Sequence, residues 1–473
     1  MQIAVKSLSF RYPNAEEKTL DNINFELPEG SFTTLCGMSG SGKSTLLRML
    51  KPCLRPHGEL SGEILPELSE NQAAREIGFV MQNPEAQICT DRVWHELAFS
   101  LESVGERPEK MRRGIAECAE YFGLEQLFER ETSSLSGGEK QLLALASAAA
   151  LHPKLLLLDE PTSQLDPVSA RSFFDIITRL NRDLGMTVLI AEHRLEELFP
   201  ISDRVIVMDK GRVIADREPR GLLKALPKDH PMLSAFPVSM RIFALANAQG
   251  EPPVSIREGR QCSAVTEYLQ KNKPMPLKSD GKPILTVKDL CVCYGKRAAL
   301  SSVSLSVRKG EVYALLGGNG SGKSTLLKAI FGIVKPFGGK ITRDKTLKLA
   351  YLPQNPCMIL DEEALDLSGG EQQRLALEKL LSQNPDVLLL DEPTKGMDAH
   401  SKAIFAEKLR EINATVLLVT HDLEFAASCA DRCGLLFNGE IVSEGEPTDF
   451  FAGNFFYTTP LCRLAKGITE GHI

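Results

Sequence analysis

Hydrophobic and polar residues follow two different patterns along this 473-residue chain. Short apolar runs, such as those at 32–37, 155–160 and 187–192, alternate with stretches of helical periodicity. That order is typical of a parallel sheet covered by helices. Residues 3–10 and 284–292 instead alternate between polar and apolar side chains, which indicates a smaller antiparallel layer. The pattern therefore predicts an α/β fold.

A long internal repeat explains why each pattern occurs twice. Three segments recur in the same order in the two halves of the chain, and self-similarity of this kind predicts two domains of the same fold. The segments are GMSGSGKST at 37–45 and GGNGSGKST at 317–325, LSGGEKQ at 135–141 and LSGGEQQ at 367–373, and LLLLDEPT at 155–162 and VLLLDEPT at 387–394.

The spacing of the repeats shows that the second half is shorter. The first segment begins at position 37 and the second at 135, whereas their copies begin at 317 and 367, which are much closer together. A QNP triplet locates most of the loss, because its glutamine is Gln82 in the first half but Gln354, shortly before LSGG, in the second. Most of the missing residues therefore fall between this glutamine and LSGG, and we expect a truncated helical subdomain there.

The domain boundaries follow from the repeat and from proline content. Residues 219–283 contain nine prolines and little periodicity, which is typical of a linker with short structured pieces. We predict a first domain over 1–228, a linker over 229–282 and a second domain over 283–473. Each domain should have a mainly parallel sheet, a small antiparallel subdomain and a helical subdomain.

Composition narrows the class of protein. The chain is 43% hydrophobic and 25% charged, as expected for folded domains, and its net charge of -7 argues against nucleic acid as a partner. No window approaches 18 uncharged apolar residues, and the N-terminus lacks a secretory pattern. The 11 scattered cysteines, including Cys291 and Cys293, fit reduced core residues better than metal ligands. We therefore expect a cytosolic location.

The pattern G-x-x-x-x-G-K-[ST] occurs at 37–44 and again at 317–324, each time between an apolar strand and a helix. In that context the glycines let backbone N–H groups wrap phosphates at the positive end of the helix, and the lysine reaches the terminal phosphates. A glycine-rich turn without a ligand is the alternative. The phosphate-binding candidates are Gly37, Ser39, Gly40, Gly42, Lys43, Ser44, Thr45, Gly317, Asn319, Gly320, Gly322, Lys323, Ser324 and Thr325.

Two acidic pairs end the leucine-rich runs, at the carboxyl edge where α/β sheets bind ligands. Buried acids need partners, so we expect Mg²⁺ and water beside them. The aspartates should serve the metal together with the serine of each phosphate loop, and the glutamates should act as general bases. A structural ion pair is the alternative. The metal candidates are Ser44, Asp159, Ser324 and Asp391, and the bases are Glu160 and Glu392.

His193 and His421 each follow a further apolar strand, in TVLIAEH and TVLLVTH. A single histidine in this place is more often a core or capping residue, but the matched recurrence favours contact with the γ-phosphate. LSGG precedes a helix in both halves, so its serine and free N–H groups form a second anion site. We predict that each LSGG serves the other half, so that two nucleotides are bound between the halves.

The set of phosphate loop, glutamine, LSGGE, DEPT and histidine, in that order, resembles the ABC ATPases over nearly all of both halves. The resemblance implies that Tyr12 and Tyr294 stack on adenine and that Asp166 and Asp398 cross the interface between the halves. It also implies two hydrolytic sites with ATP and Mg²⁺ as cofactors. The first would combine Lys43, Gln82, Glu160 and His193 with Ser368 and Gly370, and the second Lys323, Gln354, Glu392 and His421 with Ser136 and Gly138.

Several stretches, including QNPEAQICTDRVWHELAFSLE, EHRLEEL and PPVSIREGR, look like the tandem ATPase of energy-coupling-factor (ECF) importers. The resemblance implies two partners at the cytoplasmic face of the cell membrane: a transmembrane coupling protein and a substrate-binding membrane protein. Sugar-import ATPases and ribosome-associated tandem ATPases are the alternatives. DNA-repair ATPases are excluded because no heptad run separates the motifs.

The segment after Gln82 carries apolar residues at helical spacing, namely Val93, Trp94, Leu97, Ala98 and Leu101. Such residues are usually core, but the family resemblance places here the groove that receives a helix of the membrane partner. Because the second half is truncated at this point, we expect the first half to make the main membrane contact. A transport-deficient variant with an internal deletion is the alternative.

Overall fold

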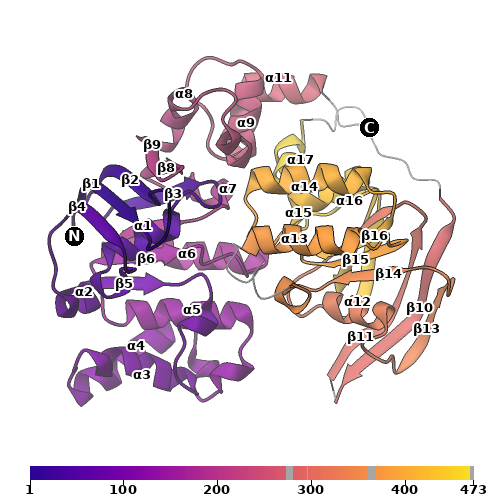
Figure 1. The fold of residues 1–473 in the computed structure, drawn as a ribbon, viewed down its shortest axis with the longest axis horizontal. Helices are drawn as coiled ribbons and strands as arrows, with labels where there is room; N and C mark the ends of the chain where they lie inside the picture. The colour runs from indigo at the N-terminus through magenta and orange to yellow at the C-terminus, as the bar shows by residue number, and fades with distance from the viewer. Residues whose placement is uncertain (273–280, 296, 361–368, 469–473) are drawn as a thin grey trace. The chain divides into compact units, whose positions relative to one another are not determined.

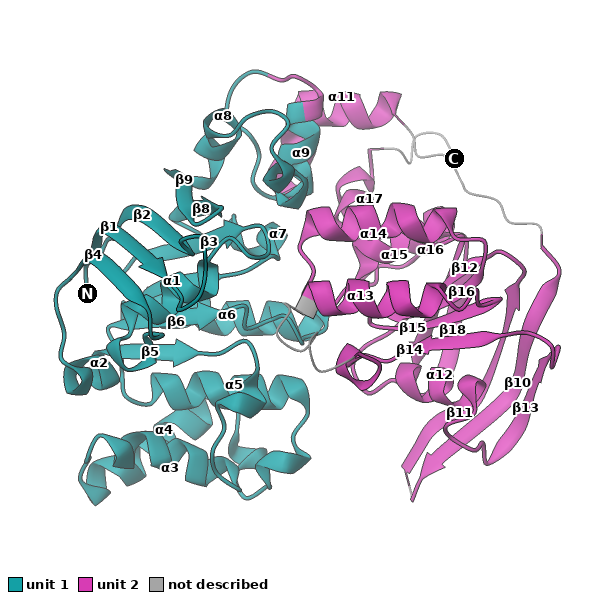
Figure 2. Ribbon diagram, viewed as in Figure 1, with its two compact units in different colours: residues 1–244, 249–255 teal, residues 245–248, 256–473 magenta. Residues whose placement is uncertain are grey.

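The computed structural model describes residues 1–272, 281–295, 297–360 and 369–468 (Figure 1). Residues 1–244 and 249–255 form one compact unit, and residues 245–248 and 256–473 form the other (Figure 2). Each unit contains one copy of the repeat and is described by itself. No helix among the described residues has the length and hydropathy needed to cross a bilayer.

The first unit is built on a six-stranded sheet whose buried strands are parallel, apart from the antiparallel edge pair β8–β9. β6 and β7 are buried along their whole length, because helices cover both faces of the sheet. The strand order is β5 (Ile77–Val80), β6 (Leu155–Asp159), β7 (Thr187–Ala191), β3 (Phe32–Gly37), β8 (Arg204–Asp209) and β9 (Arg212–Arg217).

The second unit repeats this topology strand for strand. Its sheet is again parallel apart from its last pair, β17–β18. The strand order is β14 (Leu349–Leu352), β15 (Val387–Asp391), β16 (Thr415–Thr420), β12 (Val312–Leu316), β17 (Arg432–Phe437) and β18 (Glu440–Gly445).

Each unit also has a three-stranded antiparallel sheet, as the alternating stretches near residues 3–10 and 284–292 predict. Apolar side chains of these strands form one buried cluster with the helix that follows the phosphate loop. The strand orders are β2 (Leu20–Leu27), β1 (Ile3–Arg11), β4 (Glu59–Leu65) and β11 (Arg297–Arg308), β10 (Pro283–Tyr294), β13 (Gly338–Arg343). The predicted fold class is confirmed for both halves.

Helices complete each unit, and several also lie within the segment predicted as a linker. In the first unit they are α1 (Lys43–Leu50), α2 (Glu70–Glu76), α3 (Val93–Ser103), α4 (Pro108–Phe122), α5 (Gly137–Ala149), α6 (Pro167–Leu184), α7 (Leu195–Leu198), α8 (Leu222–Ala225) and α9 (Val238–Leu245). Then follow α10 (Ile256–Gln261), α11 (Ser263–Lys271), α12 (Lys323–Phe331), α13 (Gly369–Leu381), α14 (Ala399–Glu411), α15 (Leu423–Cys429), α16 (Pro447–Gly453) and α17 (Pro460–Ala465).

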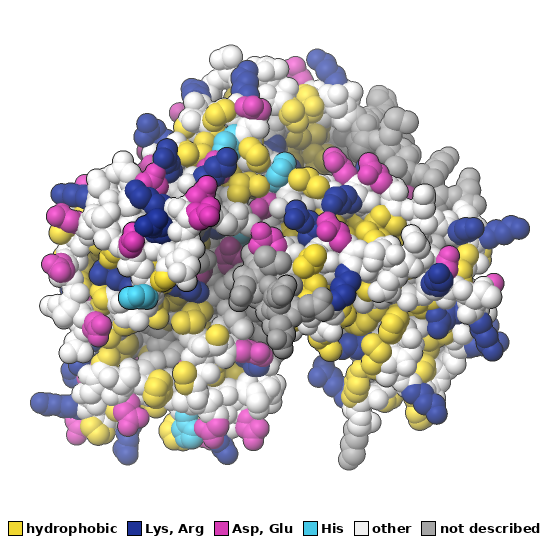
Figure 3. Space-filling view, viewed as in Figure 1, with side chains coloured by type: hydrophobic (Ala, Val, Ile, Leu, Met, Phe, Trp, Pro, Cys, Tyr) yellow, Lys and Arg dark blue, Asp and Glu magenta, His cyan; other side chains and the backbone are white. Residues whose placement is uncertain are grey.

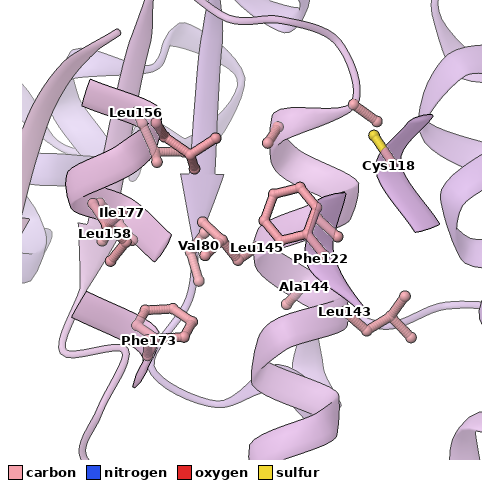
Figure 4. Close-up of a cluster of buried hydrophobic side chains, with 14 of the residues drawn as sticks. Val80, Cys118, Phe122, Leu143, Ala144, Leu145, Leu156, Leu158, Phe173 and Ile177 are labelled. Carbon is pink, nitrogen blue, oxygen red and sulfur yellow. The ribbon is translucent and has the colours of Figure 1, made fainter. Parts of the chain in front are cut away.

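The helical subdomain of the first unit consists of α3 and α4, which pack on α5. Figure 4 shows Phe122 of α4 and Leu143 of α5 in the same buried cluster as Val80 of β5. In the second unit the described residues between β14 and α13 contain only a single helical turn at Pro356–Met358. Among those residues, α3 and α4 have no counterpart, as the spacing of the repeats predicts.

α13 has polar and charged residues at positions where α5, which packs against α3 and α4, has small buried residues. Ser147 of α5 is buried and hydrogen-bonds to Ser100 of α3 at 2.5 Å between the two Oγ atoms. At the matching position of α13, counted from LSGG in each half, the sequence has Lys379. Ala146, fully buried on α5, is matched by exposed Glu378, which pairs with Lys408 at 3.8 Å. The face that carries α3 in the first unit is therefore a solvated, charged face in the second.

Exchanging one matched pair of residues tests this difference. Ser147→Lys places a charge against α3 and should lower the free energy of unfolding of the first unit by about 3 kcal/mol. Lys379→Ser should change that of the second unit by less than about 0.5 kcal/mol, because the site faces solvent. Urea unfolding followed by the fluorescence of Trp94, the single tryptophan, reports the first unit, and circular dichroism reports both. Equal effects of the two substitutions would contradict this interpretation of α13.

Candidate functional site

The phosphate loop of the first unit connects β3 to α1, and only glycine fits at several of its positions. Gly40 and Gly42 have φ of 77° and 96°, in the left-handed region. A Cβ at Gly42 would lie 2.8 Å from the carbonyl oxygen of Thr19, and one at Gly37 would lie 2.4 Å from that of Met208. These close contacts hold the loop at the N-terminus of α1, where backbone N–H groups can bind an anion.

The second unit builds the same loop between β12 and α12. Gly320 and Gly322 have φ of 77° and 107°. A Cβ at Gly317 would lie 2.5 Å from the carbonyl oxygen of Leu436, and one at Gly322 would lie 2.5 Å from that of Ala299. Ser39 and Asn319 occupy the exposed third position of the two loops. The sequence pattern therefore corresponds to one backbone geometry in both halves.

Each loop lysine is buried, and its ammonium group closes the loop on itself. Lys43 Nζ donates to the carbonyl oxygens of Gly37 at 2.9 Å and Met38 at 3.1 Å, and lies 4.0 Å from Glu160 Oε1. Lys323 Nζ makes the equivalent contacts and lies 3.7 Å from Glu392 Oε1. A buried cation at this place supplies the charge that a terminal phosphate requires.

The two aspartates predicted to serve the metal lie against the loop serines. Ser44 Oγ donates to Asp159 Oδ1 at 2.8 Å, and Ser324 Oγ donates to Asp391 Oδ1 at 2.9 Å. Burial raises the pKa of Asp159 to about 6, although the bond from Ser44 opposes the rise. Burial also raises the pKa of Asp391. A hydroxyl and a carboxylate, both hard oxygen ligands, fit Mg²⁺, and a divalent cation would offset the cost of burying the carboxylate.

Glu160 is held by the two residues that the sequence groups with it. Its backbone adopts φ of 44°, which turns the chain at the end of β6. Gln82 Nε2 donates to Glu160 Oε2 at 2.8 Å, and His193 Nε2 lies 2.8 Å from Glu160 Oε1. The structure thus brings together three candidate catalytic residues from loops after β5, β6 and β7.

Glu392 occupies the matching place in the second unit, with φ of 49°. His421 Nδ1 lies 3.0 Å from Glu392 Oε2, and the backbone N–H of His421 donates to the same oxygen at 3.2 Å. Burial would raise the pKa of Glu392, but His421 and Lys323 together outweigh it and hold the pKa below its usual value. The Gln354 side chain is exposed, and the backbone carbonyl oxygen of Gln354 accepts from Gln373 Nε2 at 3.2 Å.

The tyrosines expected at the adenine lie at the end of β1 and of β10. The Tyr12 hydroxyl is 3.2 Å from Thr45 Oγ1, and the Tyr294 side chain is 52% exposed. Thr325, the counterpart of Thr45, is half-buried. Tyr12 also lines a cavity of about 510 Å³ together with Arg11, Pro13, Asn14, Ala15, His57, Gly58 and Glu59.

The LSGG segment of the first unit forms the N-terminus of α5. Ser136 Oγ accepts from the Glu139 N–H at 3.3 Å, and Glu139 Oε2 accepts from the Ser136 N–H at 2.7 Å, a reciprocal capping box. Gly138 lies in the first turn of this helix, and Gly370 lies in the first turn of α13. Ser368 lies outside the described residues.

One contact of the second site has no signal in the sequence motifs. The Tyr351 hydroxyl donates to Asp391 Oδ2 at 3.1 Å, whereas Phe79 occupies the matching position on β5. A tyrosine in an apolar strand normally belongs to the core. The only clue is a comparison of the two halves position by position, because Tyr351 and Phe79 both lie three positions before the glutamine.

Comparison with known proteins agrees with this geometry. The family model described as "ABC transporter" matches residues 20–163, 300–360 and 358–395. A Bacillus cereus protein named as an ABC transporter ATP-binding protein is 35% identical over 98% of this chain and 94% of its own length.

The chain belongs to the ABC transporter ATPase family. Members of this family bind and hydrolyse ATP, so the chain is an ATP hydrolase. A similarly named Streptomyces avermitilis protein is 34% identical over 94% of the chain and 93% of its own length. The structure of an archaeal ribosome recycling factor, aABCE1, superposes with a TM-score of 0.63 at 22% identity, over 94% of this chain and 91% of that one. At this identity the likeness shows the ABC fold alone.

The comparisons also bear on the shorter second half of this ABC ATPase. The family model matches that half in two pieces that meet at residues 358–360, the end of the turn after β14. The alignment with the Bacillus cereus relative runs over 523 residues, whereas this chain has 473 residues in all. The relative therefore contains residues that have no counterpart here.

Asp159→Asn should stabilise the nucleotide-free protein at neutral and alkaline pH. Because burial raises the pKa of Asp159 from 3.8 to about 6, ionisation opposes folding, and the free energy of unfolding falls as pH rises through this window. Two pKa units correspond to about 3 kcal/mol, so the variant should gain up to about 3 kcal/mol at pH 8 and less at pH 4.5.

Urea unfolding followed by Trp94 fluorescence at the two pH values measures this difference. The asparagine keeps a carbonyl oxygen for Ser44, so the hydrogen bond is preserved in the comparison. A variant that is less stable than the wild type at pH 8 would show that the Asp159 carboxylate is stabilised where it lies.

Proposed function

We propose that this ABC ATPase energises a membrane importer of the ECF type, which takes up a vitamin, a metal ion or another small solute. Its partners would be a transmembrane coupling protein and a substrate-binding membrane protein, and it would work at the cytoplasmic face of the cell membrane. The observation that carries the proposal is that both units have a glutamine, a glutamate and a histidine for hydrolysis, whereas the described residues contain a single helical subdomain.

Each unit has residues that could bind the phosphates of ATP and a residue that could activate water. Lys43 and Lys323 would bind the terminal phosphates together with the N–H groups of their loops. Glu160 would accept a proton from the attacking water, while Gln82 and His193 hold its carboxylate at 2.8 Å each.

In the second unit, His421 and Lys323 outweigh burial and hold the pKa of Glu392 below its usual value, which favours the ionised form that a general base requires. Ser44 with Asp159, and Ser324 with Asp391, would hold Mg²⁺. The ion would neutralise charge on the β- and γ-phosphates when bound there.

The sharing of sites between the halves is part of the proposal. We infer that Ser136 and Gly138 serve the ATP site of Lys323, and that Ser368 and Gly370 serve that of Lys43. The capping box at Ser136 supports this, because it presents a helix N-terminus whose serine is already oriented by Glu139. Asp166 and Asp398 cap α6 and α14 of their own units, so their expected contact between the halves stays a prediction.

Only the first unit would receive the membrane partner. α3 carries Phe99, which is 48% exposed, and also the half-buried Trp94. The corresponding region of the second unit offers instead the charged face of α13, where Glu378 pairs with Arg374 and Lys408. An apolar helix of a membrane protein could pack against the exposed apolar side chain of α3. Against the charged face of α13, the same helix would bury charged groups at a cost in free energy.

Nucleic acid is not among the proposed partners. On the face in view in Figure 3, Lys and Arg side chains are interspersed with Asp and Glu. The net charge of -7 is unfavourable for binding through phosphates. The fold likeness to the ribosome recycling factor does not favour a ribosomal role, because it shows the fold alone.

Photo-crosslinking in native membranes tests the proposed partners. A benzoylphenylalanine placed at Phe99 of α3 should capture an integral membrane protein. A second probe at Leu375 of α13, which is also partly exposed, should capture none. Mass spectrometry identifies the captured chains, and detergent purification of the same complex should yield a second, substrate-binding membrane protein.

The control is measured on the same two probe variants. Both probe variants must hydrolyse ATP at the wild-type rate, which shows that each unit is folded. Crosslinks of equal strength from Leu375 would overturn the assignment of the membrane contact to the first unit. Capture of ribosomal proteins, or of nothing, would overturn the importer function.

A further inference from the structure

Glu192 is a buried carboxylate that the proposed reaction does not use. It follows β7 directly and is only 2% exposed. Glu192 Oε1 accepts from Thr162 N at 2.9 Å and from Thr162 Oγ1 at 2.5 Å. Glu192 Oε2 accepts from the backbone N–H groups of His193 at 2.9 Å and Arg194 at 3.4 Å. Donors from the loop after β6 thus bind Oε1, and donors from the loop after β7 bind Oε2.

These contacts join the loop of the base to the loop of the histidine. Thr162 lies two positions after Glu160, in the loop that follows β6, and is fully buried. β6 and β7 are neighbouring parallel strands, with Asp159 paired to Ala191. Glu192 therefore fixes the backbone of His193 against the segment that carries Glu160. The His193 Nε2 to Glu160 Oε1 contact of 2.8 Å depends on that placement.

The second unit holds its histidine by different chemistry. Thr420 replaces Glu192 at the matching position, and its Oγ1 accepts from the N–H of Asp422 at 3.0 Å. Asp422 in turn pairs with Lys402 of α14 at 2.6 Å. The backbone N–H of His421 donates to Glu392 itself, at 3.2 Å. A carboxylate clamp between the two loops is therefore a feature of the first site.

We propose that Glu192 is a positioning residue of the first ATP site, which holds His193 against Glu160 by tying the histidine loop to Thr162. The inference rests on the proposed roles of Glu160 and His193. It implies that the two ATP sites of the chain differ in how their histidine is held, although their catalytic residue types are the same. Glu192 acts through His193 and touches no reacting atom.

The substitution Glu192→Gln tests the role of the Glu192 carboxylate, because the volume of the side chain hardly changes. Its carbonyl oxygen can still accept from Thr162, but its amide group faces the N–H groups of His193 and Arg194, donor against donor. Glu392→Gln, which silences the second site, supplies the background, so that the remaining hydrolysis belongs to the first site. We expect kcat to fall by about tenfold or more, while the Kd for ATP changes by less than about threefold.

A second pair of variants separates positioning from general damage. In a His193→Ala background the Glu192→Gln change should cost little further rate, because the residue it positions is gone. The carbon-13 resonance of the His193 imidazole should also differ between the Glu192→Gln variant and the wild-type protein, both of which keep Glu160. An unchanged resonance, or a loss of rate equally large in both backgrounds, would overturn the inference. A Glu392→Gln protein that binds ATP without hydrolysing it would instead overturn the proposed role of the first site.

Discussion

The arrangement of each unit depends on keeping buried acidic and basic groups together at one edge of the sheet. Lys43 is 4% exposed and Asp159 is 4% exposed, and charges at such depth are tolerated only with close partners. The glycine loop, the strand order and the left-handed turn at Glu160 all place those partners within hydrogen-bond distance. The same groups would match the charges of a nucleotide and its magnesium ion, so we propose that the constraint on folding is also the basis of binding.

The two units meet this constraint in different ways around a shared centre. The loop lysine lies within 4.0 Å of the glutamate in both units. Beyond this shared contact, Gln82 and His193 bind Glu160, whereas the Nδ1 and N–H of His421 bind Glu392. Away from the centre, the second unit has replaced a buried face of its α5 equivalent with charged residues such as Glu378. A change of this kind stabilises a domain that works without the helical cover. We therefore interpret the short second half as a specialised unit and not as a damaged copy.

The order of the motifs was enough to predict the fold, the phosphate loops and the location of the acidic pairs, because each motif fixes a strand, a turn and a helix. The shortened second half could also be predicted, from the spacing of the repeats alone. The bonds from Thr162 to Glu192 and from Tyr351 to Asp391 could not, because they join segments that only tertiary packing brings together. Ser368 lies outside the described residues, so its predicted place in the first site stays a prediction.

The central claim is that both units hydrolyse ATP through a glutamate at the end of a buried strand. Phosphate release by the purified complex, measured for Glu160→Gln, Glu392→Gln and the double variant, tests it most directly. The account predicts that each single variant loses about half of the rate and keeps the rest, and that the double variant loses all of it while it still binds ATP. A single variant that keeps the full rate of the wild-type protein would contradict the claim for that unit.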